Sequence, residues 1–115
     1  GSIEYAVEHL ATRLILVLGH NACGGVAAAL MSLKGGELPS SPNMNKMVAD
    51  LQPHLQQFAS STPSKLLEKE SWANTKGVAS DLLARSEIIA ARVQSGEVVI
   101  KTALYHLESG KVDFE

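Results

Sequence analysis

The segment His20-Asn21-Ala22-Cys23 carries the two side chains whose types and spacing are best suited to chemistry. A histidine and a cysteine separated by two residues across a tight turn can face one metal ion, and imidazole and thiolate are both preferred zinc ligands. A thiolate at a helix N-terminus is also stabilised by unpaired backbone N–H groups. Gly24 and Gly25 follow directly, and glycines let the backbone approach an anion or a substrate closely.

A purely structural interpretation of this segment competes with a metal site. A catalytic zinc ion normally has three protein ligands and a water, and this segment offers two ligands. A buried cysteine at the start of a helix, beside a histidine bonded to the backbone, would give the same residues. The other histidines, His9, His54 and His106, lie apart along the chain and are predicted to be surface or packing residues.

The His-x-x-Cys segment lies between a predicted strand and a predicted helix. The continuous apolar run 14–18, ended by Gly19, is typical of a parallel strand that is covered on both faces. In open α/β sheets, ligands bind beyond the carboxyl ends of such strands. Apolar spacing and the positions of glycine and proline predict helices at 2–10, 23–33, 43–59 (kinked at Pro53) and 75–94 (closed by Gly96), and strands at 97–107 and 111–114 joined by a turn at Ser109-Gly110.

This order of elements predicts the α/β class. We expect one domain over residues 1–115, with a small, mostly parallel sheet flanked by helices and a hairpin strand at the C-terminal end. A chain of 115 residues that is 45% hydrophobic and 19% charged suits a single globular core.

Charge and cysteine content exclude several kinds of partner. The formal net charge is −2, without the basic patch that nucleic acids and anionic membranes require, so neither partner is expected. The longest apolar runs are far shorter than a membrane span. Cys23 is the only cysteine and cannot form an intrachain disulfide, which indicates the cytoplasm or another reducing compartment.

Three stretches, in order along the chain, resemble the β-class carbonic anhydrases. They are Ser-Ile-Glu-Tyr-Ala-Val-Glu-His-Leu at 2–10, Leu-Ile-Leu-Val-Leu-Gly-His-Asn-Ala-Cys-Gly-Gly-Val at 14–26, and a closing helix, strand and hairpin at 86–89, 96–100 and 105–112. The resemblance implies that His20 and Cys23 match the family's second and third zinc ligands, and that Gly24 lies near the approaching substrate. It also implies that zinc lowers the pKa of a bound water, whose hydroxide attacks carbon dioxide to give bicarbonate.

The sequence departs from the family pattern before the 2–10 helix. It contains no C-x-D-S-R motif, which supplies the family's first zinc cysteine and an Asp–Arg pair, and two earlier strands are not found either. Loss of one thiolate sharply reduces zinc affinity. Strand 14–18 would also lose its neighbours, so we expect a homodimer or higher oligomer in which another chain covers that strand or a helix face.

Two functions remain open at this point, beside a structural domain without any small-molecule site. The first is a β-carbonic-anhydrase-like protein with an incomplete zinc site and weak or no CO2 hydration, in which zinc is lost and Gly24 and Gly25 bind a small anion, or which acts as a scaffold. The alternative is an active zinc carbonic anhydrase that converts CO2 and water to bicarbonate and a proton. In that case another chain or segment supplies the missing ligands.

Overall fold

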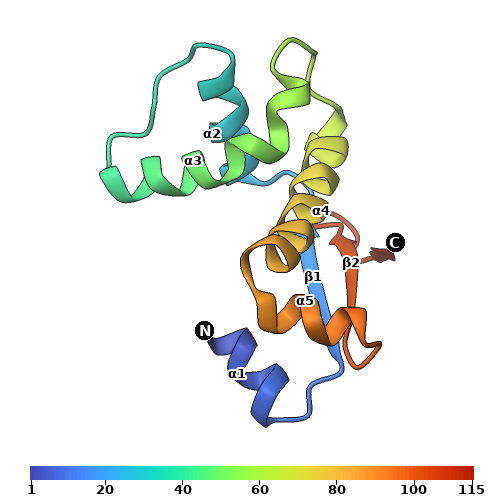
Figure 1. Ribbon diagram of the computed structural model, residues 1–115. Coiled ribbons are helices and arrows are strands. Elements are labelled where there is room, and N and C mark those ends of the chain that lie inside the picture. Colours follow the sequence, from blue (N-terminus) through green and yellow to red (C-terminus); the bar gives the residue numbers. More distant parts are fainter.

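The computed structural model describes residues 1–115 and has an α/β fold, with five α-helices, two short 3-10 helices and three strands (Figure 1). In chain order the elements are α1 (Ser2–His9), β1 (Leu14–His20), α2 (Gly24–Leu33), α3 (Pro42–Leu55), η1 (Gln56–Phe58), η2 (Lys65–Leu67), α4 (Glu68–Arg85), α5 (Glu87–Gln94), β2 (Val99–Tyr105) and β3 (Val112–Phe114).

The three strands form one mixed sheet in the order β1-β2-β3. β1 and β2 run parallel, from the Leu14–Val99 pair to the His20–Tyr105 pair, and β3 runs antiparallel to β2. A parallel pair requires a crossover connection, which here contains α2 to α5. The prediction of a small, mostly parallel sheet with a C-terminal hairpin strand is confirmed.

Two apolar clusters lie on either side of α4. The first joins α2 and α3, and the second joins α1, β1, α5 and the start of β2; their buried members are Val26, Ala29, Leu30, Val48 and Leu55 in the first, and Val7, Ile15, Ile89 and Val98 in the second. α4 contacts α3, α5 and both long strands, and Figure 1 shows it between the α2–α3 lobe and the sheet. α4 therefore connects the two apolar clusters.

β1 is covered on one face only, which corrects the prediction of a strand buried on both faces. Ile15 is buried among the helices, whereas its neighbours Leu14, Leu16 and Leu18 are 57%, 43% and 52% exposed. The physical reason is that the helices of this chain pack against the Ile15 side of the strand and leave the other side uncovered. We call the opposite side the open face; its exposed apolar residues are Leu14, Leu16, Leu18, Val99 and Phe114.

The end of β1 also differs from its prediction, because the strand continues through Gly19 to His20. Gly19 does not stop the strand; it allows α4 to lie close to it. A Cβ atom at this position would overlap Oγ1 of Thr75 on α4 and would lie 3.2 Å from the Thr75 Cβ. Glycine is needed here for a close approach rather than for a turn.

The predicted helix at 75–94 is two helices separated at Ser86. Ser86 is extended, with φ of −131°, and its Oγ accepts a hydrogen bond from the Ile89 N–H at 3.2 Å, which is the geometry of an N-cap. The same hydroxyl donates to Glu4 Oε2 at 3.0 Å and so connects α5 to α1. At its other end α4 begins earlier than predicted, at Glu68.

The remaining predicted helices and turns are present, but the helix predicted at 43–59 ends at Leu55 and is followed by the 3-10 helix η1. α3 begins at Pro42, with Ser41 as its side-chain N-cap, and continues past Pro53. Gly96 and Gly110 have φ of +79° and +75°, the left-handed geometry expected of residues that close a helix and a hairpin. None of the helices combines the length and the apolar character needed to cross a membrane.

Candidate metal centre

His20 lies at the carboxyl end of β1 with an exposed side chain. Its Nδ1 lies 2.8 Å from the carbonyl oxygen of Asn21. A carbonyl oxygen can only accept, so Nδ1 carries the proton, and in the neutral ring the lone pair lies on Nε2. Metal-binding histidines are commonly fixed in this way, by donating the other ring N–H to a carbonyl. His20 therefore presents Nε2 as a ligand atom.

Cys23 is the N-cap residue of α2 and a free, half-buried thiol beside the first apolar cluster. No side chain caps the N-terminus of α2. A Cβ atom at Gly24 would meet no other atom within 4 Å, so the space beside this residue is open. A Cβ at Gly25 would be in ordinary contact with Cys23 Sγ at 3.8 Å and Leu51 Cδ1 at 3.6 Å. Gly24 is thus the more accessible of the two predicted anion-binding residues.

The chain contains no complete metal site. No group of three His, Cys, Asp or Glu side chains is placed so that it could hold a metal ion. His20 and Cys23 have the right chemistry for zinc, but two ligands fall short of the three that a catalytic site needs. The 115 residues alone therefore do not fit a bound catalytic zinc.

The three other histidines do not join this pair. His9 is exposed on α1 beside Glu8. His106 is buried at the end of β2, with Nε2 2.8 Å from Asp113 Oδ2 and Nδ1 3.6 Å from Glu108 Oε1. Hydrogen bonding from His106 lowers the pKa of Asp113, as does hydrogen bonding from Lys111.

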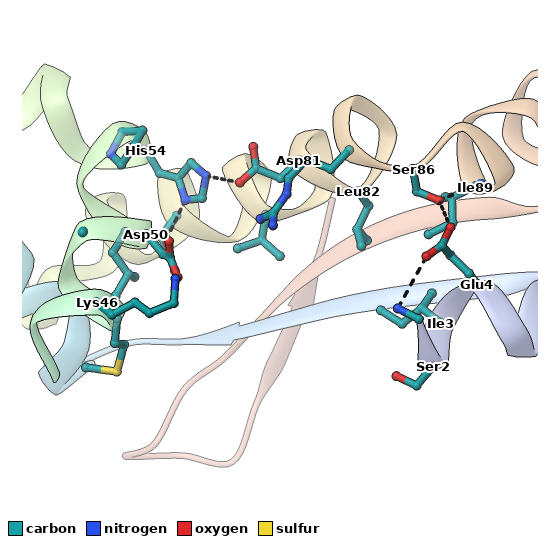
Figure 2. A pocket seen from close by; sticks show the side chains of 18 of the residues that line it. Ser2, Ile3, Glu4, Lys46, Asp50, His54, Asp81, Leu82, Ser86 and Ile89 are labelled. Carbon is teal, nitrogen blue, oxygen red and sulfur yellow. Dashed lines mark hydrogen bonds and ion pairs between the residues drawn. The ribbon is translucent and has the colours of Figure 1, made fainter. Parts of the chain in front are cut away.

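His54 lies in a separate groove of about 900 Å³ between α1, α3 and α4. Figure 2 shows its ring turned toward Asp81, with Nε2 2.8 Å from Asp81 Oδ2, while Nδ1 lies 2.9 Å from Asn74 Oδ1. A Cβ atom at Gly77 would overlap the His54 ring, so glycine makes room for it. Both ring nitrogens are engaged, and His54 therefore connects α3 to α4 as a packing residue.

Two residues that no sequence pattern singled out contact each other here: Asn21 within the His-x-x-Cys turn and Glu108 after β2. Asn21 is completely buried, and its Nδ2 donates to Glu108 Oε2 at 2.7 Å. This hydrogen bond is the largest cause of the lowered pKa of Glu108. The two residues lie 87 positions apart, so no local spacing could have indicated the contact.

The fold and this turn define a class of protein: an α/β domain that presents a His-x-x-Cys pair at the carboxyl end of a parallel strand. The carbonic anhydrase family model matches residues 1–112. The chain is 38% identical over 113 residues to a carbonic anhydrase of Mycolicibacterium smegmatis and 37% identical over 111 residues to carbonic anhydrase 2 of Mycobacterium tuberculosis. The chain belongs to the β-class carbonic anhydrase family.

Solved structures agree on the fold. A tetrameric β-carbonic anhydrase of Sordaria macrospora superposes with a TM-score of 0.79 at 20% identity, over 97% of this chain and 56% of that one. A β-carbonic anhydrase of Aspergillus fumigatus gives 0.79 at 22% identity, over 98% of this chain and 53% of that one. The chain likewise spans 54% and 53% of its two mycobacterial relatives, or about half their length.

Proposed function

We propose that this chain supplies His20 and Cys23 to a zinc site for CO2 hydration whose remaining ligands come from a second chain or segment. The 115 residues alone then hydrate CO2 weakly or not at all. The observation that carries the proposal is a pair of zinc-type ligands, one with its Nε2 already selected by a backbone contact, without a third ligand near it. The chemistry that zinc supplies in such sites is Lewis-acid activation of water.

The position of the open face supports completion of the site from outside. β1 is an edge strand. Its exposed leucines alternate along the strand and lie on the same face as His20 at its carboxyl end. A partner that covers the open face and the free edge of β1 therefore arrives beside the ligand pair. Burying three half-exposed leucines favours association by several kcal/mol, on the order of 1 kcal/mol for each. We propose a homodimer or higher oligomer that uses this surface.

A metal-free role in binding a small anion such as bicarbonate is the second candidate. It is favoured by the N-terminus of α2, which has no side-chain cap and has open space beside Gly24. Backbone N–H groups at a helix N-terminus attract anions without a metal. In this case Cys23 is a packing residue, and its replacement leaves anion binding unchanged.

Zinc binding and CO2 hydration by matched variants test the proposal. We expect zinc affinity to fall at least about tenfold in Cys23→Ser and in His20→Ala, and to stay unchanged in His9→Ala, which removes an exposed histidine away from the site. Stopped-flow hydration by the chain alone should stay near the uncatalysed rate. Zinc binding that does not depend on Cys23, or full activity of a monomer, would overturn the proposal.

An anion titration distinguishes the metal-free anion-binding function from the zinc site. The melting temperature is measured with bicarbonate or chloride at constant ionic strength, with EDTA present. A bicarbonate-specific increase that persists in Cys23→Ser supports the metal-free function. If the melting temperature does not increase, the metal-free function is excluded and the zinc proposal remains.

A further inference from the structure

The turn that carries the ligand pair is held by one buried side chain. Asn21 is 0% exposed and has three hydrogen-bonding partners, all beyond the end of β2 or at its last residue. Its N–H donates to Tyr105 O at 3.2 Å, its Oδ1 accepts from the Leu107 N–H at 3.0 Å, and its Nδ2 donates to Glu108 Oε2 at 2.7 Å. Asn21 therefore joins the His-x-x-Cys turn to the β2–β3 connection.

The orientation of the Asn21 amide follows from its partners. A backbone N–H can only donate and an ionised carboxylate can only accept, so Oδ1 must face Leu107 and Nδ2 must face Glu108. A flipped amide would put two donors together and two acceptors together. This pairing makes asparagine the matching partner for a carboxylate at Glu108.

The next residue of the turn has an unfavourable backbone conformation. Ala22 has φ of +48°, which residues with a Cβ atom adopt rarely and at a cost. Its N–H donates to Leu66 O at 2.6 Å, so a second segment also holds the turn. A strained turn persists only when its surroundings determine it. The hydrogen bonds of Asn21 fix the turn on one side, and the hydrogen bond from Ala22 to Leu66 fixes it on the other.

The far end of the contact is anchored as well. Glu108 lies 3.6 Å from buried His106, whose other ring nitrogen is 2.8 Å from Asp113 on β3. The backbone N–H of His106 also donates to the carbonyl oxygen of Lys111 and closes the hairpin. Glu108 is half exposed, but this arrangement limits where its carboxylate can lie.

We propose that Asn21 and Glu108 are positioning residues that hold the turn so that His20 and Cys23 face one point. The inference rests on the proposed function, because positioning matters only if the two residues bind a common ligand. It does not require the complete site, since the hydrogen bonds lie within this chain.

Exchange of the donor and acceptor groups tests the pair. Asn21→Asp places a carboxylate against Glu108 and should open the turn. Glu108→Gln keeps an acceptor oxygen for Asn21 and should behave like the unmodified chain. In the double variant the glutamine amide at position 108 donates to the carboxylate at position 21, so the contact is restored with its donor and acceptor exchanged. Glu97→Gln is the control, since Glu97 is an exposed carboxylate bonded to Ser95 and Arg92 instead.

The first readout is hydrogen exchange of the Ala22 amide, which needs no metal. We expect Asn21→Asp to lower its protection about tenfold relative to the Val99 amide, which lies at the other end of the sheet, and the double variant to recover most of the loss. Equal protection in all variants, or a loss that the double variant does not recover, would overturn the pairing.

The second readout is Co2+ affinity, followed by thiolate-to-cobalt absorption, which reports Cys23 alone because it is the only cysteine. We expect a loss of about tenfold in Asn21→Asp and recovery in the double variant. Altered exchange at Ala22 with unchanged Co2+ affinity overturns positioning, because the contact is then only structural. If the unmodified chain shows no thiolate–cobalt band at all, the proposed function fails, and the exchange result alone decides whether Asn21 and Glu108 hold the turn.

Discussion

Replacement of Gly19 by alanine tests how closely β1 and α4 must approach. The added Cβ would overlap Thr75 Oγ1, lie 3.2 Å from Thr75 Cβ and lie 3.5 Å from Leu104 Cδ1. Thr75 is 2% exposed, and its hydroxyl donates to Ser71 O at 2.8 Å, so the side chain cannot move into solvent. The clash must displace the strand or the helix.

The size of the effect follows from these contacts. Overpacking a rigid interior costs about 1–3 kcal/mol, and loss of the Thr75 hydrogen bond adds about 1 kcal/mol. We therefore expect Gly19→Ala to lower the free energy of unfolding by about 2–4 kcal/mol. For a chain of this length that corresponds to a decrease in melting temperature of about 8–16 °C.

Urea unfolding of four proteins measures this effect: the unmodified chain, Gly19→Ala, Thr75→Ala and the double variant. Removing Oγ1 relieves the overlap, so the double variant should be more stable than the sum of the single effects, by a coupling free energy of about 1–2 kcal/mol. Gly24→Ala is the matched control, because its Cβ would meet no atom within 4 Å. A change below about 0.5 kcal/mol in Gly19→Ala, or no coupling to Thr75, would refute the reasoning.

Three further outcomes are expected. Gly77→Ala should destabilise the chain by about 1–3 kcal/mol in urea unfolding, because its Cβ would overlap the His54 ring. Burial alone would raise the pKa of Glu70, but hydrogen bonds from the Ser64 hydroxyl and amide hold it below the ordinary value of 4.5. The stabilisation by the carboxylate is therefore complete above pH 4.5 and is lost as pH falls through the lowered pKa, so Glu70→Gln should lower stability at pH 7 by about 1–3 kcal/mol and less at pH 3. Leu16→Glu on the open face should reduce self-association, measured by light scattering, with a change in monomer stability below about 1 kcal/mol.

Each of these outcomes has its own control. His54→Ala removes the ring that Gly77→Ala would strike, so the second substitution should cost less in that background. A loss of stability in Glu70→Gln that is the same at pH 3 and pH 7 would contradict the account of its carboxylate. Met44→Glu changes a residue of similar exposure on α3, away from the sheet, and should leave the oligomeric mass unchanged. An unchanged mass in Leu16→Glu as well would exclude the open face as the interface.

Local patterns in the sequence were sufficient to predict the family, the order of the elements and the position of the His-x-x-Cys turn. The His-x-x-Cys turn, the apolar run before it and the turn at Gly110 each depend on a few consecutive residues, whose backbone preferences act without distant partners. The helix break at Ser86 was harder to predict from the sequence. A serine before an apolar stretch can lie inside a helix or cap one, and here the cap also bonds Glu4 of α1.

The sequence by itself determined that this protein carries a His-x-x-Cys segment, with His20 and Cys23, in an α/β domain of carbonic anhydrase type. Only the tertiary structure decided that β1 is covered on one face. An apolar side chain indicates that a residue can be buried, but it does not indicate on which side of the strand the neighbouring elements pack. Only the tertiary structure joined Asn21 to Glu108, since hydrogen bonds between residues 87 positions apart depend on the whole crossover from β1 to β2.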